Sequence, residues 1–203
     1  MSTRLPGSHV ALSIGVALAA LLALAAARPA RADPDVAIET SPIAPVFRGA
    51  ALAVRLRPAT LPHVAFSAGL YGFTLPRFFV DQTAGNADRG WHVAIRPAGH
   101  VGADYYLRDQ GRGAHVGVAV VLARFAITSD AVAGSTAYES LYAVPRAGYT
   151  QRIWRGLYVT PSIGIEIHAK VGGSNQLGDR TFEPLHVQPT FGLQLGYVVR
   201  GSR

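Results

Sequence analysis

Residues 158–170, YVTPSIGIEIHAK, alternate between polar and apolar side chains at every step. Three isoleucines share one register, whereas Glu166, His168 and Lys170 share the other. Alternation with a period of two is typical of a β-strand with one apolar and one polar face. The apolar face of such a strand points into the core of a soluble sandwich but out to lipid in a membrane barrel. The rest of the sequence must decide between the two.

Much of the chain after residue 45 has the same two-faced pattern. In residues 114–128 the two registers exchange between Arg124 and Phe125, and a β-bulge there would restore the alternation. Several segments alternate over 12 or more residues. Strands of globular proteins average roughly 5–6 residues, whereas roughly 9–11 are needed to cross a bilayer. Seven segments are predicted as strands: 46–57, 63–74, 91–108, 114–128, 139–153, 158–170 and 185–200.

The N-terminus has the features of an export signal. Arg4 precedes an apolar run over residues 10–27, and Ala30 and Ala32 are the small residues of a cleavage site. The sequence therefore predicts a signal peptide over residues 1–32, with an uncleaved membrane anchor as the alternative. The chain has no cysteine, which excludes a lipid-modified N-terminal cysteine and any disulfide.

The charge of the chain is modestly basic. The formal net charge is +7, but the arginines are scattered and Lys170 is the only lysine. Proteins that bind nucleic acid concentrate basic residues in a patch or stripe, so no nucleic-acid partner is expected. No second apolar run reaches the length of a membrane-spanning helix.

The connections between the predicted strands alternate in length. Residues 58–62, 109–113 and 154–155 are short connections. Long, polar and glycine-containing connections occupy the intervening positions. This alternation is typical of bacterial outer-membrane barrels, which have short periplasmic turns and long extracellular loops. The long connections are residues 75–90, 129–138 and 171–183.

These features together resemble a small outer-membrane β-barrel protein of Gram-negative bacteria, of the OmpA/OmpW-like eight-stranded type. Residues 70–81 (LYGFTLPRFFVD), 86–91 (NADRGW), 147–150 (AGYT) and 189–199 (PTFGLQLGYVV) are similar to a group of uncharacterised proteins of this kind. The resemblance implies no biochemical activity. The closing strand is similar to the signal read by the barrel-insertion machinery, although such chains usually end on Phe or Trp and this one ends on Arg203.

An even strand number is expected of a single-chain bacterial barrel. Because seven strands are clear, the eighth should come from residues 33–45, where residues 35–40 alternate weakly. The sequence therefore predicts an all-β fold, an antiparallel up-and-down transmembrane β-barrel of eight strands. This barrel domain would occupy residues 33–203.

A barrel of eight strands has an interior that side chains just fill. Charged groups there must be paired and hydrogen-bonded, and Arg96 or Arg146 could reach Glu166 from other strands. The predicted lumen network consists of His92, Arg96, His100, Asp104, Arg146, Glu166, His168, Lys170 and His186.

Two chemical alternatives were considered for these polar residues. At about 3.3 Å per residue, His92 and His100 lie roughly 26 Å apart along one strand, too far apart to ligate one metal ion. A lipid-modifying enzyme would need a nucleophile beside a base, but Ser162 and His168 lie roughly 20 Å apart by the same rise, and no GxSxG motif is present. No catalytic residue, metal ligand or cofactor is therefore predicted.

A soluble periplasmic barrel that carries lipid in its mouth, like a lipocalin, is the third alternative. It would place the isoleucines of residues 158–170 inside. Against it stand the connection lengths, the strand lengths and the scarcity of lysine. Aromatic residues near strand ends also favour the membrane, because girdles of Trp and Tyr mark its interfaces. They are Trp91, Tyr105, Tyr149, Trp154, Tyr158 and Tyr197.

The sequence thus predicts a monomeric outer-membrane protein with a structural or surface role and no catalysis. Permeation of small solutes through a narrow pore is compatible with this role. Its expected partners are outer-membrane lipid and, during biogenesis, the insertion machinery. The long connections are the parts able to touch other molecules.

Overall fold

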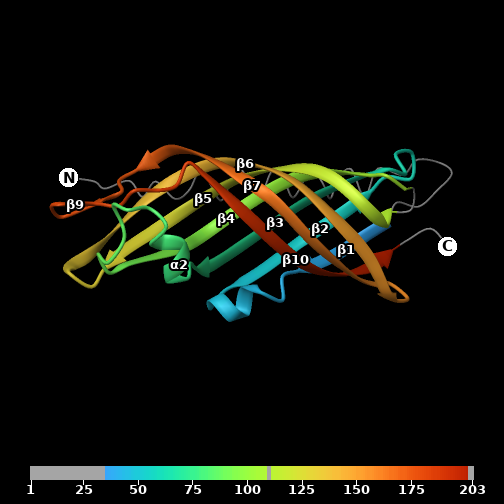
Figure 1. Cartoon of the computed structure of the whole chain (residues 1–203). Coiled ribbons are helices and arrows are strands. Elements are labelled where there is room, and N and C mark those ends of the chain that lie inside the picture. The colour runs from blue at the N-terminus through green and yellow to red at the C-terminus, as the bar shows by residue number, and fades with distance from the viewer. Residues whose placement is uncertain (1–34, 109–110, 201–203) are drawn as a thin grey trace, which may run out of the picture.

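The computed structural model describes residues 35–108 and 111–200 (Figure 1). The predicted signal peptide, residues 1–32, lies outside the described residues. The elements are β1 (Asp35–Thr40), η1 (Ala44–Phe47), β2 (Ala50–Arg57), β3 (Val64–Thr74), α2 (Arg77–Val80), β4 (Trp91–Tyr106), β5 (Gly113–Ser129), β6 (Val132–Trp154), β7 (Leu157–Gly173), β8 (Gln176–Leu177), β9 (Arg180–Thr181) and β10 (Val187–Arg200).

Eight of the strands form one closed antiparallel sheet. Their order around the ring is β1-β10-β7-β6-β5-β4-β3-β2, so each strand lies beside its neighbour in sequence and β1 closes the ring against β10. Figure 1 shows the long tilted strands and the small β9 and α2 segments at one end. The predicted all-β, antiparallel, eight-stranded fold is confirmed, and the weakly alternating segment 35–40 is the eighth strand. No helix in the described residues is long and apolar enough to cross a membrane.

Many large apolar side chains are exposed on the barrel wall. On β7, Ile163, Ile165 and Ile167 point outward, and Ile163 is 70% exposed. Glu166 and His168, in the alternate register, turn inward, so alternation along a strand separates an apolar exterior from a polar interior. The same exterior surface includes Leu52, Leu70, Val101, Val116, Val118, Val120, Leu141, Phe191 and Val199.

The hairpin of β5 and β6 differs from the sequence prediction. Residues 129–138, expected as a long loop, mostly continue the two strands, and only Asp130 and Ala131 connect them. Phe125 and Ile127 are buried inside and Arg124 is exposed, with no bulge at that point of β5. The apparent exchange of registers reflects a change in what surrounds the strand, because at this end of the barrel the interior is apolar and the exterior polar.

A β-bulge occurs instead on β4. Ile95 pairs with Phe125, whereas the next pair is Ala98 with Ala123, so β4 has one residue more than β5 over this interval. A bulge exchanges the faces on either side of it. Val93 and Ile95 are therefore buried before the bulge, whereas Ala98 and Asp104 are buried after it.

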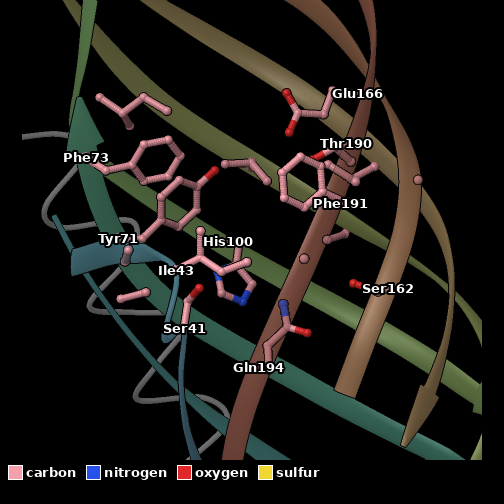
Figure 2. Close-up of a pocket in the computed structure, with 18 of the residues that line it drawn as sticks. Ser41, Ile43, Tyr71, Phe73, His100, Ser162, Glu166, Thr190, Phe191 and Gln194 are labelled. Atoms are coloured by element: carbon pink, nitrogen blue, oxygen red, sulfur yellow. The ribbon is translucent and has the colours of Figure 1, made fainter. Parts of the chain in front are cut away.

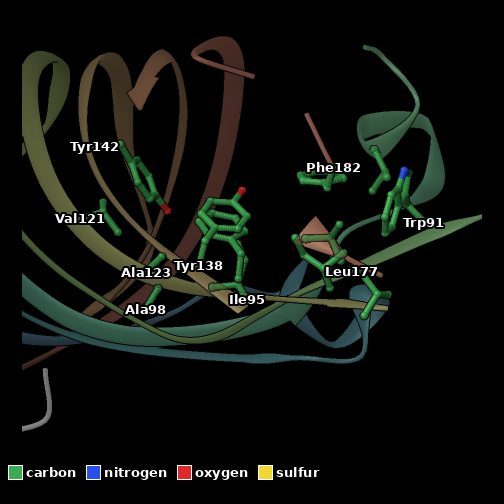
Figure 3. Packing of buried hydrophobic residues seen from close by; sticks show 13 residues of the cluster. Trp91, Ile95, Ala98, Val121, Ala123, Tyr138, Tyr142, Leu177 and Phe182 are labelled. Carbon is green, nitrogen blue, oxygen red and sulfur yellow. The ribbon is translucent and has the colours of Figure 1, made fainter. Parts of the chain in front are cut away.

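At the end that carries the β5–β6 turn, the barrel is closed by a layer of buried side chains that we call the aromatic cap (Figure 3). Phe125 stacks on Tyr138 with 4.9 Å between ring centroids, and Trp91 packs edge-on against Phe182 at 5.9 Å. The long connections cover this layer, because Asn86 donates to the Glu183 carbonyl at 2.7 Å and accepts from its amide at 2.9 Å. The cap consists of Val80, Trp91, Val93, Ile95, Ala98, Val121, Ala123, Phe125, Ile127, Tyr138, Tyr142, Leu177 and Phe182.

Candidate functional site

Toward the end of the barrel with the short connections, the interior holds a network of paired charges, which we call the charged lumen. Arg55 on β2 donates from Nε to Glu39 at 2.7 Å and from Nη1 to Asp104 at 3.0 Å. Arg146 on β6 reaches the same Asp104 with Nε and Nη2, at 2.9 and 3.0 Å. Asp104 is 1% exposed, so its charge is compensated by two guanidinium groups rather than by bulk water.

Hydroxyl groups extend this network to the other side of the barrel. The Tyr158 hydroxyl on β7 donates to Glu39 at 2.8 Å. Arg55 donates to the Tyr106 hydroxyl at 2.7 Å, and a further contact at 3.2 Å joins Tyr106 to Thr150. The network therefore links β1, β2, β4, β6 and β7 and fills the lumen where it lies.

Glycines on the neighbouring strands make room for these large side chains. A Cβ on Gly117 would lie 2.1 Å from the Asp104 carboxylate and 2.5 Å from the Ala103 carbonyl. On β10, a Cβ on Gly196 would lie 2.2 Å from the Tyr158 ring. The side chains thus lie flat across the adjacent strand, which no residue with a Cβ at these positions permits.

A second polar cluster lies farther along the barrel, between the charged lumen and the aromatic cap. Glu166 accepts from His168 at 3.0 Å and from the Gln188 amide. The His168 ring stacks on Tyr142 with 4.2 Å between centroids. Tyr142 in turn hydrogen-bonds Tyr71 across the barrel. The partner of Glu166 is thus a histidine and not the Arg96 or Arg146 that the sequence suggested.

This cluster contains a serine, a histidine and a glutamate in hydrogen-bonded order. Ser140 lies 3.3 Å from Nδ1 of His168, whose Nε2 meets Glu166. Nucleophilic catalysis requires in addition that a substrate reach the hydroxyl. Ser140 is 1% exposed, lines none of the cavity described below, and also contacts the Ala169 carbonyl at 3.3 Å. The Ser140 hydroxyl is therefore not exposed to a molecule in that cavity. Ser162, the serine weighed from sequence, forms no hydrogen bond with His168 among the described contacts.

Of the nine predicted lumen residues, the structure brings two pairs together. Asp104 with Arg146 and Glu166 with His168 are direct partners. His100 lines the lumen cavity, but no described residue hydrogen-bonds its ring.

The other four predicted residues lie outside the lumen network, which corrects the prediction. Arg96 is exposed on the outer face because the β4 bulge reverses its side. His92 lies before the same bulge, 41% exposed, and meets Asp130 at 2.8 Å. Lys170 is exposed and donates to Asn175 at 2.8 Å, beyond the level of the polar interior. His186 is exposed in the connection just before β10.

Sequence reasoning missed several members of the charged lumen. Arg55 and Glu39 were not singled out, because 46–57 alternates poorly and 35–40 is short. Each is nevertheless a charged residue next to apolar residues in its strand, a pattern that indicates a position in the interior. Tyr106 and Tyr158 were also missed as interior residues. Tyr158 was expected in an interfacial girdle but is buried against Glu39, and Trp91, expected there too, is 1% exposed in the aromatic cap.

A cavity of about 290 Å³ lies between the charged lumen and the aromatic cap. The part of the cavity next to the charged lumen is lined by Arg55, Ser67, His100 and Arg146. Its apolar lining residues include Phe73, Phe79, Ile95 and Phe125. Figure 2 shows Tyr71, His100 and Glu166 pointing into this space beside β10.

Among the described residues, no three potential metal ligands of the His, Cys, Asp or Glu types gather at one point. Comparisons with protein-family models, with curated proteins and with solved structures find no match to this chain.

Proposed function

We propose that the chain is an outer-membrane β-barrel protein with a filled lumen and a structural or surface role, without catalysis. The observation that carries the proposal is the inverted polarity of the barrel. Ile163, Val116 and Phe191 are exposed on the outside, whereas Asp104 and Glu39 are buried inside. A water-soluble barrel buries its apolar face, whereas a barrel in lipid exposes it. The same observation argues against the lipocalin-like alternative.

The ends of the apolar exterior support the same proposal. Tyr105, Tyr149, Trp154 and Tyr197 are half or more exposed at the end with the short turns. Aromatic residues of this kind form the girdles at membrane interfaces. At the opposite end the exterior turns polar, with Arg96 and Arg124 exposed on β4 and β5.

The filled interior supports a structural or surface role over free diffusion of solutes. The charged lumen joins strands across the barrel, and the aromatic cap with its overlying connections covers the other end. The connections that hold Asn86 and Glu183 would project outside the cell and offer a surface to other molecules.

Cell fractionation and gel mobility test the proposal. The full chain is produced in a Gram-negative host, and outer membranes are separated from the periplasmic fraction. We expect the protein in the outer membrane, with a band that migrates faster before boiling than after it. Recovery in the soluble periplasm without a mobility shift would contradict the membrane proposal.

Single-channel recording then separates a filled barrel from a pore. Purified protein in a planar bilayer is expected to give no stable conductance steps, because side chains fill an eight-stranded barrel. Regular steps in the wild-type protein would instead favour narrow permeation.

A further inference from the structure

The wall of the barrel is incomplete on one side. β1 has only six residues and ends at Thr40, which pairs with Leu195 of β10. Residues 187–194 of β10 therefore pair with β7 alone, and residues 50–52 of β2 pair with β3 alone. No described strand lies between these two edges. The segment of residues 41–49, with η1, occupies this position instead.

The cavity reaches the exterior at this gap. Its lining includes Ser41, Ile43 and Phe47 from the covering segment. It also includes side chains of the outer surface: Leu52 at 61% exposed and Phe191 at 58%. Figure 2 shows Ile43 beside Tyr71 and His100, with Phe191 facing them from β10. Because side chains fill both ends of the barrel, the gap is the open approach to the cavity within the described residues.

The part of the cavity next to the charged lumen has hydrogen-bond donors without partners. The Ser67 hydroxyl is buried, at 3% residue exposure, and has no hydrogen bond. Ser67 pairs directly with Arg55 on β2. No described residue accepts from Nη2 of Arg55 or from Nη1 of Arg146. The buried Ser67 hydroxyl without a partner costs roughly 1–3 kcal/mol, which a hydrogen bond to a bound ligand would offset.

Each carboxylate that lines the cavity already has two partners at one of its oxygens. Glu39 accepts from Arg55 and Tyr158, and Glu166 accepts from His168 and Gln188. The Ser67 hydroxyl can donate or accept, but the guanidinium nitrogens of Arg55 and Arg146 can only donate, so they favour a ligand that accepts hydrogen bonds. The apolar lining from Phe73, Ile95 and Phe125 suits a hydrocarbon chain.

We propose that this cavity binds a single-chain amphiphile whose head accepts hydrogen bonds, and that the ligand enters sideways between β10 and residues 41–49. The head lies at Ser67, Arg55 and Arg146, and the chain lies against the apolar lining toward the gap. The volume of about 290 Å³ lies at the small end of small-molecule sites, which span roughly 300–1,000 Å³, so one chain suits it better than a lipid with several chains. The inference rests on the proposed membrane location, because the gap opens on the apolar exterior.

Photo-crosslinking in the membrane tests this site. The full chain in liposomes is exposed to a 12-carbon fatty acid with a photoreactive group near the carboxylate, and adducts are mapped by mass spectrometry. We expect adducts on lumen-facing residues such as Tyr71 and His100. Unlabelled dodecanoate and its neutral glycerol ester should compete, and dodecyltrimethylammonium should compete at least about tenfold less well. Adducts confined to outward-facing residues such as Ile165, or equal competition by the ammonium compound, would overturn the proposal.

Two variants sharpen the test. Ser162→Trp fills the cavity without removing a described hydrogen bond and should lower lumen adducts about tenfold. The matched control Ser135→Trp, at an exposed position outside the cavity, should leave them unchanged. Ser67→Ala should weaken competition roughly fivefold without lowering resistance to urea, because it removes an unpaired hydroxyl. Unchanged adducts in Ser162→Trp and unchanged competition in Ser67→Ala would contradict the site.

The gel-mobility assay separates failure of this site from failure of the membrane proposal. A wild-type protein that shows the unboiled band in outer membranes but acquires no lumen adducts refutes the ligand site alone. A protein without the shift refutes the membrane barrel itself. Every variant is checked for the same shift before its adducts are compared.

Discussion

The charged lumen and the aromatic cap occupy the same barrel but are built in opposite ways. Around Asp104 the interior is ionic and the exterior apolar, whereas around Trp91 the interior is aromatic and the exterior carries Arg96. One β-bulge on β4 separates the two arrangements. In the proposed membrane barrel, this difference corresponds to lipid around the charged lumen and water around the cap. Strands of 16 to 23 residues, as in β4 and β6, are long enough to serve both.

The largest expected effect comes from breaking the charged lumen. Asp104→Ala leaves the Arg55 and Arg146 guanidinium groups without their shared acceptor. Loss of one partner from a buried ion network costs about 3–5 kcal/mol. Urea unfolding from liposomes, followed by tryptophan fluorescence, measures the change. Asp179→Ala, at an exposed position in the β8–β9 connection, is the control and should be neutral.

Truncation in the aromatic cap should cost somewhat less. Trp91→Ala removes a side chain that is 1% exposed and should lower the free energy of unfolding by about 3 kcal/mol. The indole Nε1 has no hydrogen-bond partner, so Trp91→Phe keeps the packing without losing a bond and should cost clearly less. Equal losses in the two variants, measured by the same unfolding assay, would argue against an apolar interior at this level.

A smaller effect on stability is expected from an arginine outside the barrel, and comparing it with an arginine in the charged lumen tests where the bulge places each side chain. Arg96→Ala should change stability by no more than about 0.5 kcal/mol, because the side chain is exposed on the outer surface. Arg146→Ala, in the charged lumen, should cost several-fold more because it leaves Asp104 with Arg55 alone. An equal loss of stability in both variants would contradict the exposed position of Arg96 and the bulge at that point of β4.

The smallest effect concerns pH at the turn between β5 and β6. Hydrogen bonding by His92, supported by the nearby charges of His92 and Arg77, holds the pKa of Asp130 below its ordinary value. A lowered carboxyl pKa stabilises the fold above the unfolded pKa, about 3.9, and the contribution is lost as pH falls through the folded pKa. Amide exchange at this turn should therefore quicken only in acid, relative to neighbouring amides. The variant Asp130→Asn should show no such change.

How far the sequence predicts this molecule depends on what surrounds each strand. Alternation predicts seven strands, and the even strand number of bacterial barrels adds the eighth. Alternation also predicts the inward direction of Glu166 and His168, because β7 has no bulge at those residues. It fails at Arg96 and His92, because a single bulge reverses a face and leaves little trace in the sequence. It also fails at residues 129–138, because at this end of the barrel the interior is apolar and the exterior polar, the reverse of the pattern elsewhere. The Arg55–Glu39 pair joins two neighbouring strands, β1 and β2, whose alternation is too weak to show which of their side chains face inward.

Lipid exposure of the apolar wall is measured most directly with single cysteines, since the natural chain has none. An environment-sensitive fluorophore is attached at Ile163→Cys on β7 and, in a second protein, at Thr128→Cys on β5, and both are reconstituted in liposomes that contain brominated lipid. The account predicts strong quenching at residue 163, where the apolar wall meets lipid, and little at residue 128, beside the aromatic cap. Little quenching at residue 163 would contradict a membrane barrel.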